Sequence, residues 1–164
     1  MGETIVGELP CDDCKTSTDE ALRARAIRES MDQQMAKDMA RNTALNELAS
    51  NVNVSITSLM KDYAKRREIN QNEELGRNTD QIINTWVDQI IQGYRTICEK
   101  YTFTTRPNGT KVYKCYLVVE LNIENVAKSL YRKLSEDEKI HLDYDYEKFK
   151  SEFKEELNRH DKSR

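Results

Sequence analysis

The chain has 164 residues, of which 37% are hydrophobic and 34% are charged, and its formal net charge is −3. This length fits one domain with a sizeable core. The acidic balance argues against a dedicated nucleic-acid-binding protein, for which a basic domain is expected. Two short basic clusters are therefore interpreted as solvated faces rather than phosphate-binding patches; they are Arg23, Arg25 and Arg28, and Lys65, Arg66 and Arg67.

No segment predicts a membrane span or a signal peptide. A helical span needs ~20 apolar residues, whereas the longest apolar run, Cys115–Val119, has the length of a strand. The first residues are neither basic nor followed by an apolar stretch. We therefore expect either a cytoplasmic protein or an exported one whose leader has been removed.

The N-terminal third is predicted to contain a short strand at Thr4–Leu9 and a loop over residues 10–19, which are turn formers throughout. Residues 20–29 are ambiguous. Their local propensity favours a helix, yet Leu22, Ala24 and Ala26 alternate with arginines, which is the period of a strand.

Residues Met31–Tyr63 predict one long helix with a continuous apolar stripe. A capping box of Ser30 and Gln33 is expected to start it. Positions four apart lie above one another on a helix. The resulting row is narrow at first and then aliphatic, and we expect it to face a sheet; its members are Ala36, Ala40, Ala44, Leu48, Val52 and Ile56.

A second helix is predicted after the cap Thr79–Asp80, followed by two strands, Tyr94–Thr105 and Val112–Leu121. Pro107, Asn108 and Gly109 fit a three-residue hairpin loop with a bulge. This loop predicts three opposed pairs: Phe103 with Tyr113, Tyr101 with Cys115, and Ile97 with Val119. It also places Cys98 on the face opposite Cys115, so these two cysteines cannot be bridged, and Cys115 is expected to be a buried, inert thiol.

The C-terminal region is predicted to be helical. Asn122 is expected to cap a helix with one apolar face that ends near Leu134, and Ser135 with Glu138 forms a capping box that opens a charged tail. Phe149, Phe153 and Leu157 are four apart and suggest a last amphipathic helix. We expect residues 135–164 to add little to the core and to form a docked or partner-facing helix.

Cys11-Asp-Asp-Cys14 is the one compact chemical motif. A CxxC pair can be half of a zinc site, a redox pair or a disulfide. Zinc needs a second pair of ligands at short spacing, and neither His141 with His160 nor Cys98 with Cys115 supplies it. Two carboxylates between the thiols would raise their pKa, which disfavours redox chemistry. A structural disulfide or idle thiols at Cys11 and Cys14 are therefore the favoured interpretation.

No motif for catalysis, nucleotides or a cofactor is present, such as a P-loop, a GxSxG elbow or an HExxH pair. His141 is interpreted as a surface histidine. Asp143 and Asp145, with the acidic run Glu136–Glu138, lack the glycine and closing Glu of a calcium loop. We therefore predict a protein that is not an enzyme and holds no cofactor or metal.

Several segments together resemble the LPP-twenty family of small bacterial envelope lipoproteins, over roughly residues 5 to 134. The resemblance is carried by Pro10–Cys11, Leu22–Ser30, the helix positions Ala36, Ala40, Arg41, Leu45, Leu48 and Ala49, and the segments Ile91–Lys100 and Lys114–Leu121. It implies long helices on a small, mostly antiparallel sheet, export to the cell envelope and no catalytic residue. Because Pro10 precedes it, Cys11 does not fit a lipidation site, so any lipid anchor would lie upstream of this sequence.

We therefore predict an α+β fold in two layers, with residues 20–28 as a strand and about four strands in all, since pairing can override local propensity. Residues 1–134 are expected to form one domain and residues 135–164 a charged helical tail. The predicted function is a non-catalytic, exported bacterial envelope protein acting through protein contacts, with the partner and oligomeric state open. Two alternatives are a thiol–disulfide or zinc protein using Cys11 and Cys14, and a small-ligand binder with a cleft between the helices and the sheet.

Overall fold

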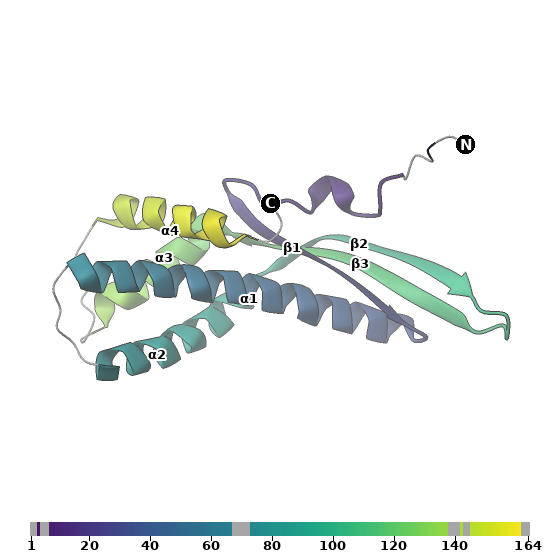
Figure 1. Ribbon diagram of the computed structural model, residues 1–164, viewed down its shortest axis with the longest axis horizontal. Helices are drawn as coiled ribbons and strands as arrows, with labels where there is room; N and C mark the ends of the chain where they lie inside the picture. Colours follow the sequence, from purple (N-terminus) through teal and green to yellow (C-terminus); the bar gives the residue numbers. More distant parts are fainter. Residues whose placement is uncertain (1–2, 4–6, 67–72, 138–141, 143–144, 162–164) are drawn as a thin grey trace.

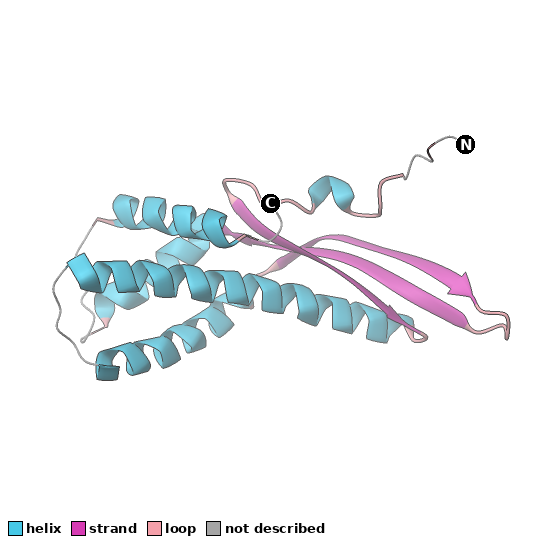
Figure 2. Ribbon diagram, in the orientation of Figure 1, coloured by secondary structure: helices cyan, strands magenta, loops and turns pink. Residues whose placement is uncertain are grey.

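The structure is a computed structural model and describes residues 3, 7–66, 73–137, 142 and 145–161. Its fold is α+β, as predicted: one antiparallel sheet is packed against a layer of helices (Figures 1 and 2). The described elements, after a short 3-10 helix at Asp12–Cys14, are β1 Ala21–Ser30, α1 Gln33–Arg66, α2 Glu73–Ile91, β2 Arg95–Thr105, β3 Lys111–Asn122, α3 Ile123–Glu136 and α4 Tyr146–His160.

The sheet has three described strands in the order β1-β3-β2, and both pairings are antiparallel. The strand predicted at residues 20–28 is therefore confirmed, with Ala21 opposite Asn122 and Ser30 opposite Tyr113. The fourth strand was expected at Thr4–Leu9. Residues 4–6 of that segment lie outside the described part, and residues 7–9 are not in a strand.

The inner face of the sheet is covered by α1. This face carries Leu22, Ala24 and Ala26 of β1 and the alternate β3 side chains from Cys115 to Leu121, all of them buried. Ala36, Ala40 and Ala44 of α1 are completely buried against it. Small side chains on both surfaces let the helix backbone approach the sheet closely, so the predicted orientation of the alanine row is confirmed.

The helix starts differ from the sequence-based expectations. Asp32, rather than Ser30, caps α1: its Oδ1 accepts hydrogen bonds from the backbone N–H groups of Gln34 (2.9 Å) and Met35 (3.2 Å). A carboxylate one residue before the helix reaches these N–H groups directly. The second helix, α2, begins at Glu73, ahead of the expected cap at Thr79–Asp80.

The hairpin register is confirmed from Cys98 to Thr105, with Phe103 opposite Tyr113 and Tyr101 opposite Cys115. Gly109 has φ 87°, the left-handed conformation that the predicted loop requires. A bulge lies between Thr96 and Cys98, so Thr96 and not Ile97 is opposite Val119. The prediction for Ile97 was therefore wrong, because one inserted residue shifts the pairing at this point.

The helices α2, α3 and α4 gather around the half of α1 that lies away from the β2–β3 hairpin tip (Figure 1). Asn122 caps α3 as predicted, its Oδ1 accepting from the Asn125 N–H at 2.9 Å. Phe149, Phe153 and Leu157 of α4 are buried in the same core as α1. The expectation that residues 135–164 add little to the core was wrong; of the predicted Ser135–Glu138 capping box, Glu138 lies outside the described residues.

Candidate functional site: a disulfide-anchored strap on the outer face of the sheet

Residues 9–17, here called the strap, lie against the outer face of the sheet, opposite α1, where Cys11 packs with Tyr116 and Val118 of β3. The strap is compact: the Leu9 N–H donates to Asp12 Oδ2 (2.8 Å), the Asp12 N–H donates to the Leu9 carbonyl (3.2 Å), and Asp12–Cys14 form one turn of 3-10 helix. Asp12 thus closes the turn with both its side chain and its backbone N–H, and Asp commonly stabilises turns through such local hydrogen bonds. The loop predicted over residues 10–19 has this ordered turn within it.

A disulfide joins the strap to the sheet. Cys11 is bonded to Cys98 of β2, 87 residues away, and their Cα atoms are 5.9 Å apart. Cys11 is buried with Tyr116 and Val118, and Ile27, Ile97, Cys98 and Cys14 pack against this small apolar cluster. A Cys11–Cys14 disulfide, one of the interpretations favoured from the sequence, is therefore not formed, and Cys14 is a free thiol.

The sequence reasoning missed Cys98 as the partner of Cys11. Its register correctly placed Cys98 on the face away from Cys115, and the two cysteines are not bridged, as predicted. One signal in the sequence was the position of Cys98 on the outer face of the sheet, where no predicted element packed against it. Pairing it with Cys11 required the knowledge that the strap folds over this face, and no local pattern in residues 9–17 predicts that.

Ion pairs hold the strap beside the disulfide. Asp12 pairs with Arg25 of β1 and with Lys15 Nζ at 3.4 Å. The backbone hydrogen bond from Leu9 is the main reason that the pKa of the Asp12 carboxyl lies below its usual value, and Arg25 and Lys15 lower it further. Ser17 Oγ accepts from the Arg23 N–H at 2.9 Å, and Arg23 donates to the Thr16 carbonyl at 3.3 Å.

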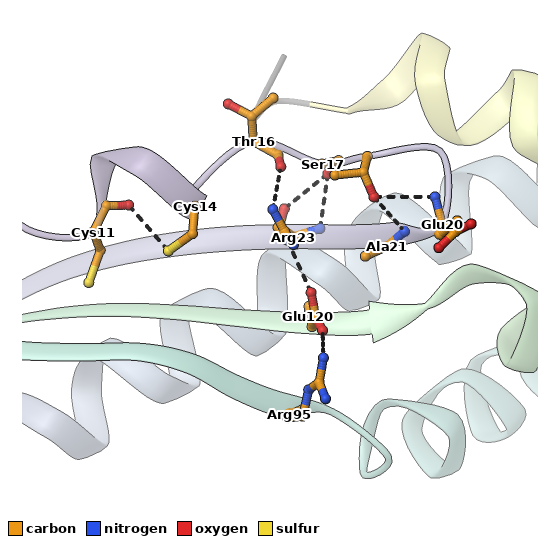
Figure 3. Close-up of polar contacts among 10 residues, drawn as sticks. Cys11, Cys14, Thr16, Ser17, Glu20, Ala21, Arg23, Arg95 and Glu120 are labelled. Atoms are coloured by element: carbon orange, nitrogen blue, oxygen red, sulfur yellow. Dashed lines mark hydrogen bonds and ion pairs between the residues drawn. The ribbon is translucent and has the colours of Figure 1, made fainter.

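A second charge cluster spans all three strands. Glu120 of β3 accepts from Arg23 Nε of β1 at 3.0 Å and also pairs with Arg95 of β2 (Figure 3). Burial alone would raise the pKa of the Glu120 carboxyl, but the two guanidinium groups outweigh it and hold the pKa below its ordinary value. The arginines Arg23 and Arg25, interpreted from sequence as a solvated face, are therefore structural partners of carboxylates.

The two free thiols have different surroundings. Cys14 is half-buried, and its Sγ lies 3.6 Å from the Cys11 carbonyl oxygen. Burial and the Asp13 carboxylate raise the pKa of the Cys14 thiol. Cys115 is completely buried on the inner face, as predicted, and burial raises the pKa of its thiol although the Tyr101 hydroxyl acts in the opposite direction.

The remaining candidate groups are dispersed. Within the described ranges no group of three or more His, Cys, Asp or Glu side chains could hold a metal ion. His141 and Asp143 lie outside the described residues, while Asp145 precedes α4. His160 of α4 has its Nε2 3.4 Å from Glu156 Oε2.

Among the cavities lined by described residues, two adjoin α1 and α4. One, of about 390 Å³, is lined mainly by charged side chains, including Asp62, Lys65, Glu155 and Arg159. The other, of about 250 Å³, lies where β1, α1 and the end of α4 meet and includes Arg23, Asn51 and His160. Ligand pockets are usually apolar with a few converging polar groups. The first cavity differs from such a pocket because its lining is mainly charged.

Comparisons with known proteins give no relatives: the chain matches no protein family, no curated protein and no solved structure. In the described part of the chain no helix combines the length and apolar character needed to cross a bilayer. The fold and the site thus define an α+β protein whose N-terminal strap is fixed to its sheet by a long-range disulfide.

Proposed function

We propose that this chain is a non-catalytic, exported protein that works through protein contacts in the bacterial cell envelope. The observation that supports export most directly is the Cys11–Cys98 disulfide, which closes a loop spanning 87 residues of sequence. Disulfides persist in oxidising compartments such as the periplasm and are rare in the cytosol of mesophiles. The resemblance to the LPP-twenty lipoproteins agrees with this location.

The protein-contact part of the proposal is supported by the end of the molecule at the β2–β3 hairpin tip. Met31, Met35 and Phe103 are the most exposed large apolar side chains of the described residues, at 63%, 50% and 58%. Met31 lies in the turn between β1 and α1, Met35 in the first turn of α1, and Phe103 near the end of β2. This turn and the hairpin tip are at the same end of the molecule, where the hairpin extends past α1 (Figure 1). Strand β2 is also an edge strand, and edge strands can pair with another chain.

The compartment is tested on protein isolated from its source cells without reductant. We expect two of the four cysteines, Cys14 and Cys115, to be alkylated after denaturation, with Cys11 and Cys98 recovered as a linked pair. Four alkylated cysteines would contradict export to an oxidising compartment.

The contact surface is tested with a photo-crosslinking amino acid at position 103, compared in the same cells with one at position 84. Asn84 is exposed on α2, and α2 lies at the end of the molecule away from the hairpin tip (Figure 1). We expect a discrete crosslinked species only from position 103. Equal crosslinking from both positions, or none from position 103, would contradict a contact surface at the hairpin.

Thiol chemistry at Cys11 and Cys14 is a second candidate function, and one observation favours it: the free Cys14 thiol packs against the cluster that holds the Cys11–Cys98 bond. Elemental analysis and thiol titration of the purified protein separate it from a purely structural role. A bound zinc ion or a rapidly titrating thiol at neutral pH would favour this candidate.

A further inference from the structure

Cys11 lies within bridging reach of two cysteines at once. Its Cα is 5.9 Å from that of Cys98, to which it is bonded. Cys14 follows three residues later through a 3-10 turn, closed by the Cys14 N–H donating to the Cys11 carbonyl at 3.4 Å. Cys11 precedes this 3-10 helix and Cys14 ends it, so the two residues bound one hydrogen-bonded turn, and the first and fourth Cα atoms of such a turn lie within about 7 Å of each other. Bridged cysteines have Cα atoms ~4.4–6.8 Å apart. The strap geometry therefore suits either partner.

The Cys14 side chain lies on the correct side of the strap. The side chains of Cys11 and Cys14 both extend from the 3-10 turn toward the sheet (Figure 3), and Cys14 and Cys98 pack against the same apolar cluster as Cys11. Cys11 is also the one non-glycine among the described residues with a positive φ, at 68°. Backbone strain of this kind tends to be found at functional positions, and here it lies on the cysteine shared by the two pairings.

We propose that Cys11, Cys14 and Cys98 form an intramolecular thiol–disulfide exchange site, which switches the Cys11–Cys98 bond to a Cys11–Cys14 bond and so unlocks the strap. The Cys14 thiol first loses its proton to solvent. The thiolate then attacks Cys11 Sγ, a sulfur–sulfur bond forms between Cys14 and Cys11, and the bond to Cys98 breaks. Cys98 leaves as a thiolate and takes a proton from solvent. No net oxidation or reduction occurs, so no co-reactant is needed.

Exchange would change how the strap is held. In the Cys11–Cys98 form a covalent bond joins the strap to β2, in addition to the Asp12–Arg25 pair and the contacts of Ser17 with Arg23. In the Cys11–Cys14 form the covalent bond to β2 is absent, and noncovalent contacts such as these hold the strap. Tyr116 and Val118 are buried in the apolar cluster around Cys11. They would then become accessible to solvent whenever the strap separates from the sheet.

Burial and the charged groups around Cys14 set the pH range of the exchange. Burial is the main reason that the pKa of the Cys14 thiol is raised, and Asp13 of the strap and Glu120 of β3 raise it further, while Arg23 of β1 and Lys100 of β2 lower it. The net effect is an upward shift of this pKa, so the thiolate is scarce at neutral pH and the exchange is slow there. Below the pKa the thiolate fraction, and with it the exchange rate, rises about tenfold per pH unit.

The test follows the disulfide pairing by peptide mapping. The oxidised protein is held at pH 7 or pH 9, quenched in acid, alkylated and digested with trypsin without reductant. The starting form gives residues 1–15 linked to residues 96–100, with Cys14 alkylated. The exchanged form gives residues 1–15 with an internal disulfide, and residues 96–100 alkylated at Cys98. We expect the exchanged form to appear much faster at pH 9, at a rate independent of protein concentration.

Two variants make the result decisive. Cys14→Ser should leave Cys98 blocked at pH 9, whereas Cys115→Ala should exchange as the wild type does, because Cys115 lies on the opposite face. Cys98 that stays blocked in the wild type at pH 9 would overturn the proposal, as would alkylation of Cys98 in Cys14→Ser. A linked peptide that fragmentation identifies as Cys14–Cys98 would overturn the proposed attack on Cys11. Unlike the thiol count on cell-derived protein, this experiment starts from oxidised protein and does not depend on the compartment.

Discussion

Asn51 in the middle of α1 donates a hydrogen bond from Nδ2 to the backbone carbonyl of Leu157 in α4, at 3.5 Å. Both residues are buried, and Ser55 Oγ donates to Asn51 Oδ1 at 3.0 Å. A buried amide that loses its partner costs free energy, so this contact fixes how α4 lies on α1. The last helix is therefore bound to the centre of the molecule through polar as well as apolar contacts.

The first prediction concerns this helix. Phe153→Ala should lower the free energy of unfolding by about 3–5 kcal/mol, because it leaves a cavity beside Phe149 in a fully buried stack. Urea denaturation followed by circular dichroism measures the change. Ser151→Ala, at an exposed position of the same helix, is the control and should change stability little. Equal stability of both variants would mean that α4 does not belong to the core.

The second prediction concerns the close contact between α1 and the sheet. Ala44→Leu should cost about 1–3 kcal/mol, because three added carbons do not fit against a sheet that already buries Ala44 completely. Thermal unfolding compares it with Asn46→Leu, which places the same side chain at an exposed position of α1. A larger loss at position 46 than at position 44 would reverse the orientation of the helix.

The sequence pattern predicted the elements whose periodicity is strong in a short window. The alternation of Leu22, Ala24 and Ala26, taken together with the family resemblance, predicted β1 against a local propensity for helix. The alanine row predicted the face of α1 that meets the sheet. Pro107 to Gly109 fixed the register as far as Cys98. In each case the residues that decide the structure are close together in the chain.

The features that the sequence did not predict depend on contacts between distant segments. The bulge that shifts Ile97 out of the pairing has no glycine or proline to mark it. The three apolar residues of α4 looked like a thin stripe, yet they are fully covered because α1 and α3 provide the remaining surface. Cys11 pairs with Cys98 only because the strap crosses the outer face, and the nearer Cys14 made a local pairing the simpler hypothesis.

The third prediction concerns the stability that the disulfide provides. The double variant Cys11→Ala with Cys98→Ala should be less stable than the wild type by about 2–5 kcal/mol, because the bond closes a long loop and restricts the unfolded chain. Urea denaturation without reductant measures the difference. Cys14→Ala keeps the disulfide and is the matched control. If the double variant were as stable as Cys14→Ala, the bond would contribute nothing to the fold.

The fourth prediction concerns the pH dependence of stability. The folded-state pKa of Glu120 lies below its unfolded value. Its contribution is therefore fully present above the unfolded pKa and is lost as the pH falls through the folded pKa. Glu120→Gln should make the loss of stability below about pH 4.5 shallower than in the wild type. Glu147→Gln, at an exposed position of α4, should keep the wild-type profile; an unchanged profile in Glu120→Gln would show that the two arginines do not lower this pKa.

The fifth prediction concerns the order in which the two free thiols react in the folded protein. Burial raises the pKa of both thiols, but Cys14 is only half-buried whereas Cys115 has no exposed surface. An alkylating reagent must reach the sulfur as well as find a thiolate. In native protein we therefore expect Cys14 to be labelled slowly, and faster as the pH rises, while Cys115 is labelled only at the rate of unfolding. Time-resolved mass spectrometry of the intact protein measures both rates, and Cys14→Ser should lose the faster phase. Labelling of Cys115 as fast as that of Cys14 in native protein would mean that α1 does not cover the inner face of β3, and it would contradict the packing of the helices on the sheet.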